Sequence, residues 1–338
     1  MGQRADFAIG DALVSAGHRR IVHLPVSVLS DHTPVNLSVE VIHGRRDGPV
    51  VFVSAAVHGD EVIGVEIVRR LLRAPALRGM RGTLLVVPIV NTYGFLSHSR
   101  YLPDRRDLNR SFPGSRGGSL ASRLAHLFLT EVVSRASLGI DLHSAAIHRT
   151  NLPQIRVSPG NADTLHLARV FGAPVILTSP QRPGSLRAEA RAKGVEVLLY
   201  EAGEGLRFDE AAVKAGVAGI LRVLRHKGMI AGRETVAWPL SLLCTSSTWL
   251  RAPAGGILRS YKADGDRVQP GDLMAVVTDP FGEREAALRA PSAGIVVGRA
   301  MLPVVNEGDA IYHLAKVSAL GAGLPVVAEP VFDEDEII

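Results

Sequence analysis

Two residues with metal-binding side chains, His58 and Glu61, lie three positions apart in the sequence. They follow residues 50–53, an apolar and mostly β-branched run that predicts a strand buried on both faces. The apolar positions after Glu61 predict a helix, and we expect Asp60 and Glu61 in its first turn, where the helix dipole favours negative charge. An imidazole and a carboxylate at this spacing can converge on one divalent cation, for which zinc is the first candidate.

The position of this pair between a predicted strand and a predicted helix also points to function, because ligands of open α/β sheets bind at the carboxyl ends of strands. A chance histidine beside a capped helix start explains the same pattern, since H-x-x-E is a short motif. This motif alone does not favour metal binding over a chance histidine.

A third candidate ligand, His143, ends a second short apolar run at residues 138–142. With His58 and Glu61 it completes a His, Glu, His set, the composition of catalytic zinc sites that keep a fourth position for water. Asp141 precedes His143 by two residues and can hydrogen-bond to a metal ligand without binding the metal itself. Other histidines of this half do not end strands, and an isolated histidine is more often a surface residue than a ligand (His98, His126 and His148).

Four short motifs occur in order along the chain: HGDE at 58–61, DLNRSFPG at 107–114, DLHSA at 141–145 and YEAGE at 200–204. Together they resemble the succinylglutamate desuccinylase/aspartoacylase family, a branch of the zinc carboxypeptidase clan. The resemblance covers roughly residues 20–318. It implies a catalytic domain with one Zn²⁺ per chain, and a small C-terminal β domain.

The segment from 91 to 114 is long for a loop, and such loops are usually functional. Its arginines can bind a substrate carboxylate through two parallel hydrogen bonds or stabilise an oxyanion, although a solvated basic loop is the ordinary interpretation. The resemblance identifies Asn109 and Arg110 with the family's substrate-carboxylate pair. It also makes Arg100 the candidate that assists the carbonyl oxygen, with Arg105 as the alternative because the spacing is longer than in the aspartoacylase branch.

The sequence VEVLLYEAGE at 195–204 predicts a buried strand that carries Glu201 near its carboxyl end. A carboxylate beside a metal can act as general base and then pass the proton to the leaving amine. Glu204 competes for this role on spacing alone, but it follows Gly203 on a predicted turn, and the family's catalytic glutamate matches Glu201. The alternative is that one of the two glutamates only caps the next segment.

The composition is that of a globular protein: 338 residues, of which 46% are hydrophobic and 21% charged. The net charge of +5 comes mainly from arginines spread along the chain, and aromatic residues make up only 5%. A nucleic-acid-binding surface would need clustered basic residues and aromatic platforms. We therefore expect no nucleic-acid partner and favour a small carboxylated N-acyl substrate. The single cysteine, Cys244, excludes an internal disulfide, and its apolar neighbours predict a buried, inert thiol.

The start of the sequence lacks the apolar core of a signal peptide, and no run of about eighteen apolar residues is present. We therefore expect a cytoplasmic protein without a membrane partner. A homo-oligomer is compatible with the sequence, which does not decide the oligomeric state.

Strand and helix patterns alternate through the first two thirds of the chain. An antiparallel pair of strands at 20–43 leads into the strand at 50–53. Further strands are predicted at 82–90, 139–142, 175–178 and 195–199, and helices at 119–135, 161–171, 184–193 and 209–227. This alternation predicts an α/β fold with a mostly parallel or mixed sheet and helices on both faces. The resemblance to zinc carboxypeptidases implies the same fold.

After Gly228 the sequence changes to short β segments, and we place a domain boundary between residues 232 and 233. Residues 250–277 and 288–315 both begin with L-R-A-P and form an internal repeat, which predicts two β units that close on each other. The pattern resembles the lipoyl/biotinyl barrel-sandwich hybrid, but the expected hairpin tip at 278–283 holds no carrier lysine. We therefore expect residues 233–338 to form a structural or substrate-gating domain with an acidic, solvated tail.

Together these features predict a zinc-dependent hydrolase that cleaves the amide bond of a small N-acyl amino acid or a related acylated amine. One alternative is a metallocarboxypeptidase acting on peptides, which the small C-terminal domain disfavours because that domain narrows access in family relatives. The other is a non-catalytic ligand-binding protein, which the complete ligand set and Glu201 disfavour.

Overall fold

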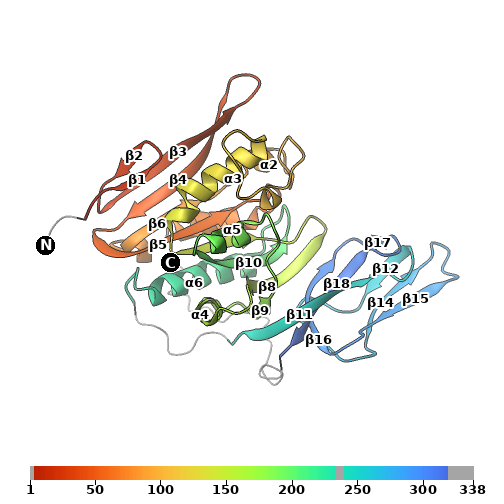
Figure 1. Cartoon of the computed structure of the whole chain (residues 1–338). Coiled ribbons are helices and arrows are strands. Elements are labelled where there is room, and N and C mark those ends of the chain that lie inside the picture. The colour runs from red at the N-terminus through yellow and green to blue at the C-terminus, as the bar shows by residue number, and fades with distance from the viewer. Residues whose placement is uncertain (1–3, 233–239, 319–338) are drawn as a thin grey trace.

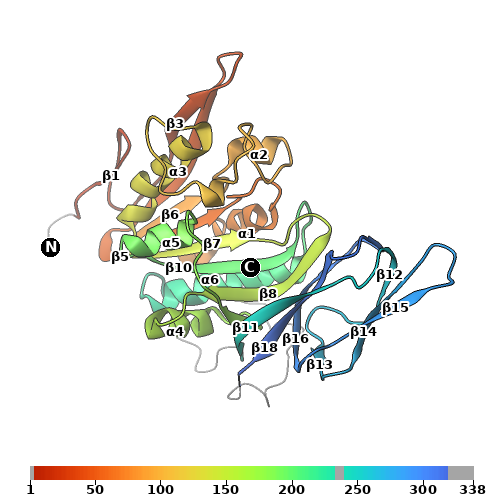
Figure 2. The same ribbon diagram turned by 45° about the vertical axis from the view of Figure 1, so that its right-hand side comes forward.

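The computed structural model describes residues 4–232 and 240–318. The predicted domain boundary between residues 232 and 233 and the predicted acidic tail lie outside these ranges. We call residues 4–232 the N-terminal unit and residues 240–318 the C-terminal β unit. Figures 1 and 2 show the C-terminal β unit at one end of a sheet that runs through both units.

The main sheet is mixed and has twelve strands. In spatial order they are β13 (Arg267–Val268), β16 (Gly294–Ala300), β18 (Ala310–Val317), β11 (Leu242–Arg251), β9 (Val175–Thr178), β8 (Arg149–Val157), β10 (Glu196–Glu204), β7 (Leu138–His143), β5 (Arg46–Ala55), β6 (Arg81–Val87), β4 (Pro34–His43) and β3 (His18–Val28). Strands β6, β5, β7 and β10 run parallel, as do β8, β9 and the start of β11. A hairpin of β1 (Phe7–Ile9) and β2 (Ala12–Val14) forms a separate small sheet.

Helices cover both faces of the sheet. One face carries α1 (Ile63–Leu71), α4 (Ala162–Phe171) and α6 (Glu210–His226), and the other carries α3 (Leu120–Glu131) and α5 (Leu186–Ala192). Strand β5 alternates between the two cores, since Val51 and Val53 pack with the first set and Phe52 with the second. The connections hold α2 (Thr92–Leu96) and the 3₁₀ helices η1 (Pro75–Leu77), η2 (Leu108–Arg110) and η3 (Val133–Arg135). The predicted α/β fold with helices on both faces is confirmed.

Helix α1 begins at Ile63, with Val62 as its N-cap residue. The prediction that Asp60 and Glu61 occupy its first turn is therefore wrong. These residues lie in a tight turn in which the backbone N–H of Glu61 donates to the carbonyl of His58 at 3.2 Å. The turn packs against α2 so closely that a Cβ at Gly59 would lie 1.9 Å from the carbonyl carbon of Gly94. Only glycine fits at this position.

Strand β8 has no counterpart among the predicted elements. Its sequence, RTNLPQIRV, shows neither the alternation nor the apolar run of a strand, because the polar residues Asn151 and Gln154 take buried positions. Pro153 coincides with an irregularity in the antiparallel ladder to β10, where the pairs shift between Glu201 and Gly203. A proline is tolerated in a central strand at such an interruption.

The C-terminal β unit contains two layers. Strands β13, β16, β18 and β11 belong to the main sheet, and β15 (Glu285–Arg289), β14 (Leu273–Thr278), β12 (Gly256–Ser260) and β17 (Val304–Val305) form a second sheet. The two halves of the sequence repeat have equivalent strand pairings. In the first half β12 pairs with β14 and with β17 of the second half, and in the second half β16 pairs with β18 and with β13 of the first half. The described part of this unit contains no helix, as predicted. Its likeness to the lipoyl/biotinyl hybrid stays a prediction.

Strand β11 joins the two units, because its first residues pair with β9 and most of its length pairs with β18. Cys244 lies at this junction and is fully buried. Burial raises the pKa of its thiol to about 12, so the predicted buried thiol is present. Among the residues that the structure describes, no helix has both the length and the hydropathy that a membrane crossing requires.

Candidate active site

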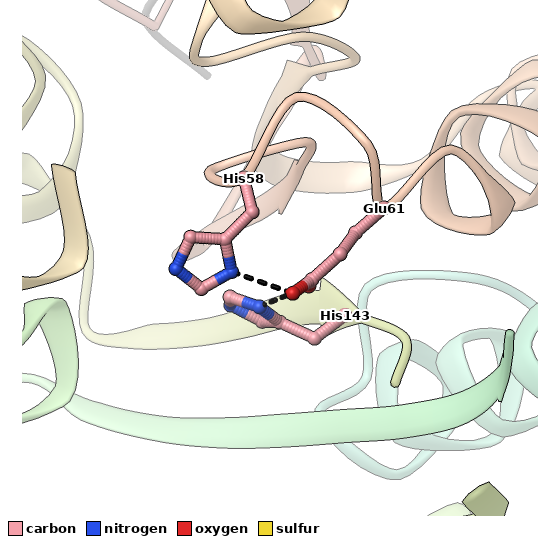
Figure 3. A group of neighbouring side chains, drawn as sticks. All are labelled: His58, Glu61 and His143. Carbon is pink, nitrogen blue, oxygen red and sulfur yellow. Dashed lines mark hydrogen bonds and ion pairs between the residues drawn. The ribbon is translucent and has the colours of Figure 1, made fainter. Parts of the chain in front are cut away.

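The side chains of His58, Glu61 and His143 meet where β7 ends and just beyond the end of β5 (Figure 3). Nδ1 of His58 donates to Oε1 of Glu61, and Nδ1 of His143 donates to Oε2, both at 2.7 Å. All three residues are buried. One ligand atom from each lies within 4.8 Å of the other two, so the structure brings the three predicted metal ligands together.

Two further carboxylates hold the far nitrogens of the imidazoles. Oδ2 of Asp141 accepts from Nε2 of His143 at 2.7 Å, and Oδ1 of Asp107 accepts from Nε2 of His58 at 3.2 Å. Ser54 donates to the other oxygen of Asp141 at 2.7 Å. Both rings are thereby fixed with Nδ1 directed at Glu61. Carboxylates behind metal-binding histidines fix the tautomer and the ring orientation in this way.

The ionisation of these groups is strongly coupled. Burial alone would lower the pKa of His143, but Asp141 and Glu61 outweigh it and raise that pKa well above its usual value. Burial would also lower the pKa of His58, but Glu61 and Asp107 raise it above its usual value. Burial would raise the pKa of Glu61, yet the two imidazoles hold it far below its usual value. The site therefore favours positive charge between these side chains.

The local charge fits a divalent cation. The buried carboxylates of Asp60, Glu61 and Asp141 and the half-buried carboxylate of Asp107 lie around the two histidines. The guanidinium of Arg100 contacts Glu61 and Asp107. Two imidazoles and one carboxylate form a donor set that zinc accepts readily. A cation bound there would take the place of the Nδ1 protons.

The predicted arginines fall in different surroundings. Arg100 reaches the site, because its Nη1 donates to Oε1 of Glu61 at 3.2 Å and its Nη2 donates to Oδ2 of Asp107 at 3.0 Å. Arg105, its alternative, is exposed on the loop. Arg110 is also exposed, with Nη1 donating to the carbonyl of Asn109.

The DLNR motif ties the loop to the rest of the site. Asp107 caps η2 by accepting from the backbone N–H of Asn109 at 2.8 Å, while its carboxylate also contacts His58. Oδ1 of Asn109 accepts from the backbone N–H of Leu186 at 2.9 Å. The side-chain oxygen of Asn109 is thus used inside the protein, and its NH₂ group is the part that can donate to a ligand.

Glu201 is next to His143 in the sheet, because the two residues pair in register on the parallel strands β10 and β7. Residues paired in this way place their side chains on the same face. Glu204 is the last residue of β10, so the prediction that it lies on a turn is wrong. Its Oε1 accepts from the backbone N–H of His148 at 3.0 Å, which gives this carboxylate a local binding partner.

Sequence reasoning missed two residues that contact Glu201. Nδ2 of Asn151 donates to its Oε2 at 3.0 Å, and Nη1 of Arg156 lies 3.3 Å from its Oε1. Both residues belong to β8, the strand that the sequence did not predict. It also missed the contact of Asp107 with His58, although Asp107 opens the DLNR motif, which was a usable signal.

A family model described as the succinylglutamate desuccinylase/aspartoacylase catalytic domain matches residues 47–227, which is 181 of the 338 residues. The chain belongs to the succinylglutamate desuccinylase/aspartoacylase family. The matched range contains His58, Glu61, His143 and Glu201, and the expectation from the four motifs is confirmed at the level of the family.

Several similar proteins match most of the chain. The N-alpha-acetyl-L-2,4-diaminobutyric acid deacetylase of Halomonas elongata is 26% identical over 286 residues, which cover 81% of this chain and 84% of the relative. A solved succinylglutamate desuccinylase/aspartoacylase from Rhodobacter sphaeroides is 26% identical with a TM-score of 0.79, covering 89% of this chain and 96% of that one. The product-bound ectoine utilization protein EutE (DoeB) from Ruegeria pomeroyi shares the fold, with a TM-score of 0.79 at 24% identity over 88% of this chain and 94% of that one.

Replacing His143 with Ala should lower bound zinc from about one ion per chain by about ten-fold or more after dialysis, because a three-ligand site loses one of its donors. Metal analysis of the purified variant, with circular dichroism to verify folding, measures this. His126→Ala on helix α3 is the matched control and should keep its metal. Full zinc content in His143→Ala would contradict the ligand assignment.

Proposed function

We propose that the chain is a zinc-dependent hydrolase that cleaves the amide bond of a small N-acyl amino acid or a related acylated amine. The observation that carries this proposal is the convergence of His58, Glu61 and His143 beside Glu201 in a member of a deacylase family. The residues would serve as metal ligands and general base, a division of roles typical of zinc hydrolases.

The arginines near Glu201 support the proposal that the substrate carries a free carboxylate. Burial and the nearby guanidinium of Arg156 lower the pKa of Arg187 to about 10. Nη1 of Arg187 is buried and has no hydrogen-bond partner among the described residues. Arg182 adds further positive charge near both Arg187 and Arg110. This surplus of cations favours an anionic ligand group, and a carboxylate matches the geometry of a guanidinium.

The Halomonas relative is named for deacetylating an N-acetylated amino acid, which agrees with a substrate of this class. Asn109 and Arg110 would bind the substrate carboxylate, with Asn109 donating through its NH₂ group. Arg100 would stabilise the negative charge that develops on the carbonyl oxygen, because its guanidinium already lies against the ligand Glu61.

Zinc, when bound by His58, Glu61 and His143, would polarise the substrate carbonyl and make water more acidic. Glu201 would take the proton from the attacking water and return it to the leaving nitrogen. The carboxylates of Asp107 and Asp141 would keep the two imidazoles in their binding orientation throughout.

The function is tested by metal analysis together with a substrate panel assayed with and without a chelator. The panel contains N-acetylated 2,4-diaminobutyrate, aspartate and leucine, N-succinylglutamate, a neutral N-acyl amine and short peptides. We expect about one zinc per chain and release of a free amino acid that stops with chelator and returns with zinc. Cleavage of the peptides alone would support the carboxypeptidase alternative, and absence of metal would contradict the proposal.

Glu201→Gln should keep its zinc and lose at least about 100-fold in kcat, since the amide cannot accept the proton. Glu204→Gln is the matched control, because glutamine can still accept the hydrogen bond from His148, and it should keep kcat within about two-fold. Steady-state kinetics with metal analysis measure both. Turnover retained in Glu201→Gln and lost in Glu204→Gln would move the base role to Glu204.

Arg110→Ala should raise KM about 10- to 100-fold for carboxylated substrates, equivalent to about 1.4–2.8 kcal/mol of binding free energy. The neutral N-acyl amine should show an unchanged KM, because it lacks the group that Arg110 would bind. Equal effects on the two substrates would remove Arg110 from this role.

A further inference from the structure

The first part of β8 lies between the two units of the protein. Asn151 pairs with Gly203 of β10 on one side and with Gly298 of β16, in the C-terminal β unit, on the other. The contact between β16 and β8 extends along the strand, since the backbone N–H of Met301 donates to the carbonyl of His148 at 2.9 Å. Nε2 of the buried Gln154 also donates to the carbonyl of Val297 at 3.0 Å.

Strand β8 holds both oxygens of the Glu201 carboxylate. Asn151, which is 7% exposed, donates from Nδ2 to Oε2 at 3.0 Å, and Nη1 of Arg156 contacts Oε1 at 3.3 Å. A carboxylate held at both oxygens by one neighbouring strand has a defined orientation, and the backbone of Glu201 pairs with His143 on the other neighbouring strand. Orientation matters for a general base, because a misplacement of about 1 Å can cost about 100-fold in rate.

Gly298 sets the position of Asn151 from the side of the C-terminal β unit. A Cβ at residue 298 would lie 2.6 Å from Oδ1 of Asn151 and 2.9 Å from the carbonyl oxygen of Thr150. Both distances are shorter than the contacts that Cβ atoms make in proteins. Only glycine therefore lets β16 approach β8 this closely. The amide of Asn151 is thereby confined between Gly298 and Glu201, with Oδ1 toward the glycine and Nδ2 toward the carboxylate.

We infer that Asn151 and Arg156 are positioning residues for the Glu201 carboxylate, and that Gly298 of the C-terminal β unit fixes Asn151 in this role. The inference rests on the proposed role of Glu201 as general base. It makes the C-terminal β unit a part of the catalytic apparatus, because one of its strands determines where the base points.

The kinetic test uses two single variants and their combination in the full-length zinc enzyme. Asn151→Ala should lower kcat about 10- to 100-fold and Gly298→Ala about ten-fold, with KM within about two-fold and zinc content unchanged. Gly255→Ala is the control in the same unit, since a Cβ there meets nothing closer than 3.6 Å, and it should keep full activity. Thermal unfolding verifies that each variant folds.

The double variant shows whether Gly298 acts through Asn151. Once the Asn151 amide is gone, Gly298→Ala should cost no further activity, so the double variant should match Asn151→Ala alone. An additional ten-fold loss in the double variant would overturn the inference, because the methyl group would then act through the carbonyl of Thr150. Unchanged kcat in Asn151→Ala would overturn it as well.

Crystal structures test the positioning without any turnover. The Glu201 side chain should adopt one orientation in the wild type and move or occupy several in Asn151→Ala and Gly298→Ala. If the wild type cleaves no substrate but Glu201 moves in the variants, the proposed function fails while the positioning stands. If Glu201 keeps its orientation in both variants, the positioning fails whatever the activity.

Discussion

The burial of the Glu61 carboxylate is the constraint that the rest of the site satisfies. Glu61 is 2% exposed, and a buried carboxylate without partners would cost several kcal/mol of lost hydration. Two imidazoles and Arg100 compensate it directly. Each imidazole then needs a partner for its far nitrogen, which Asp107 and Asp141 supply, and Ser54 binds the remaining oxygen of Asp141. This network ties together three segments that are far apart in the sequence.

The parallel strands make such a network possible at one edge of the sheet. Strands β5, β7 and β10 are neighbours, and the register places His143 beside Glu201. Because these strands run in one direction, their carboxyl ends lie together, and each contributes polar residues where its apolar run stops. The hydrophobic cores on the two faces hold these strands in place, so the site depends on the packing of the helices that cover the sheet.

Much of this arrangement could be predicted, because each metal ligand lies at or shortly after the end of an apolar run that the sequence shows. The start of helix α1 could not, since it depends on the contact between Gly59 and Gly94, which are distant in the sequence. Strand β8 was missed because Asn151 and Arg156 point polar groups at Glu201, which removes the alternation that identifies a strand. Sequence patterns report the burial of apolar residues, and they do not reveal a strand whose polar groups find partners on another strand.

The junction strand β11 carries a thiol whose reactivity reports on contact between the two units. Cys244 is the single cysteine of the chain, and it lies where β11 passes from its pairing with β9 to its pairing with β18. Its apolar neighbours come from both units and include Leu177 on β9 and Ala315 on β18. A reagent can reach this thiol only when the two units separate locally or the chain unfolds. The rate at which the native protein becomes labelled therefore measures how often the interface between the two units opens, wherever unfolding of the whole chain is slower.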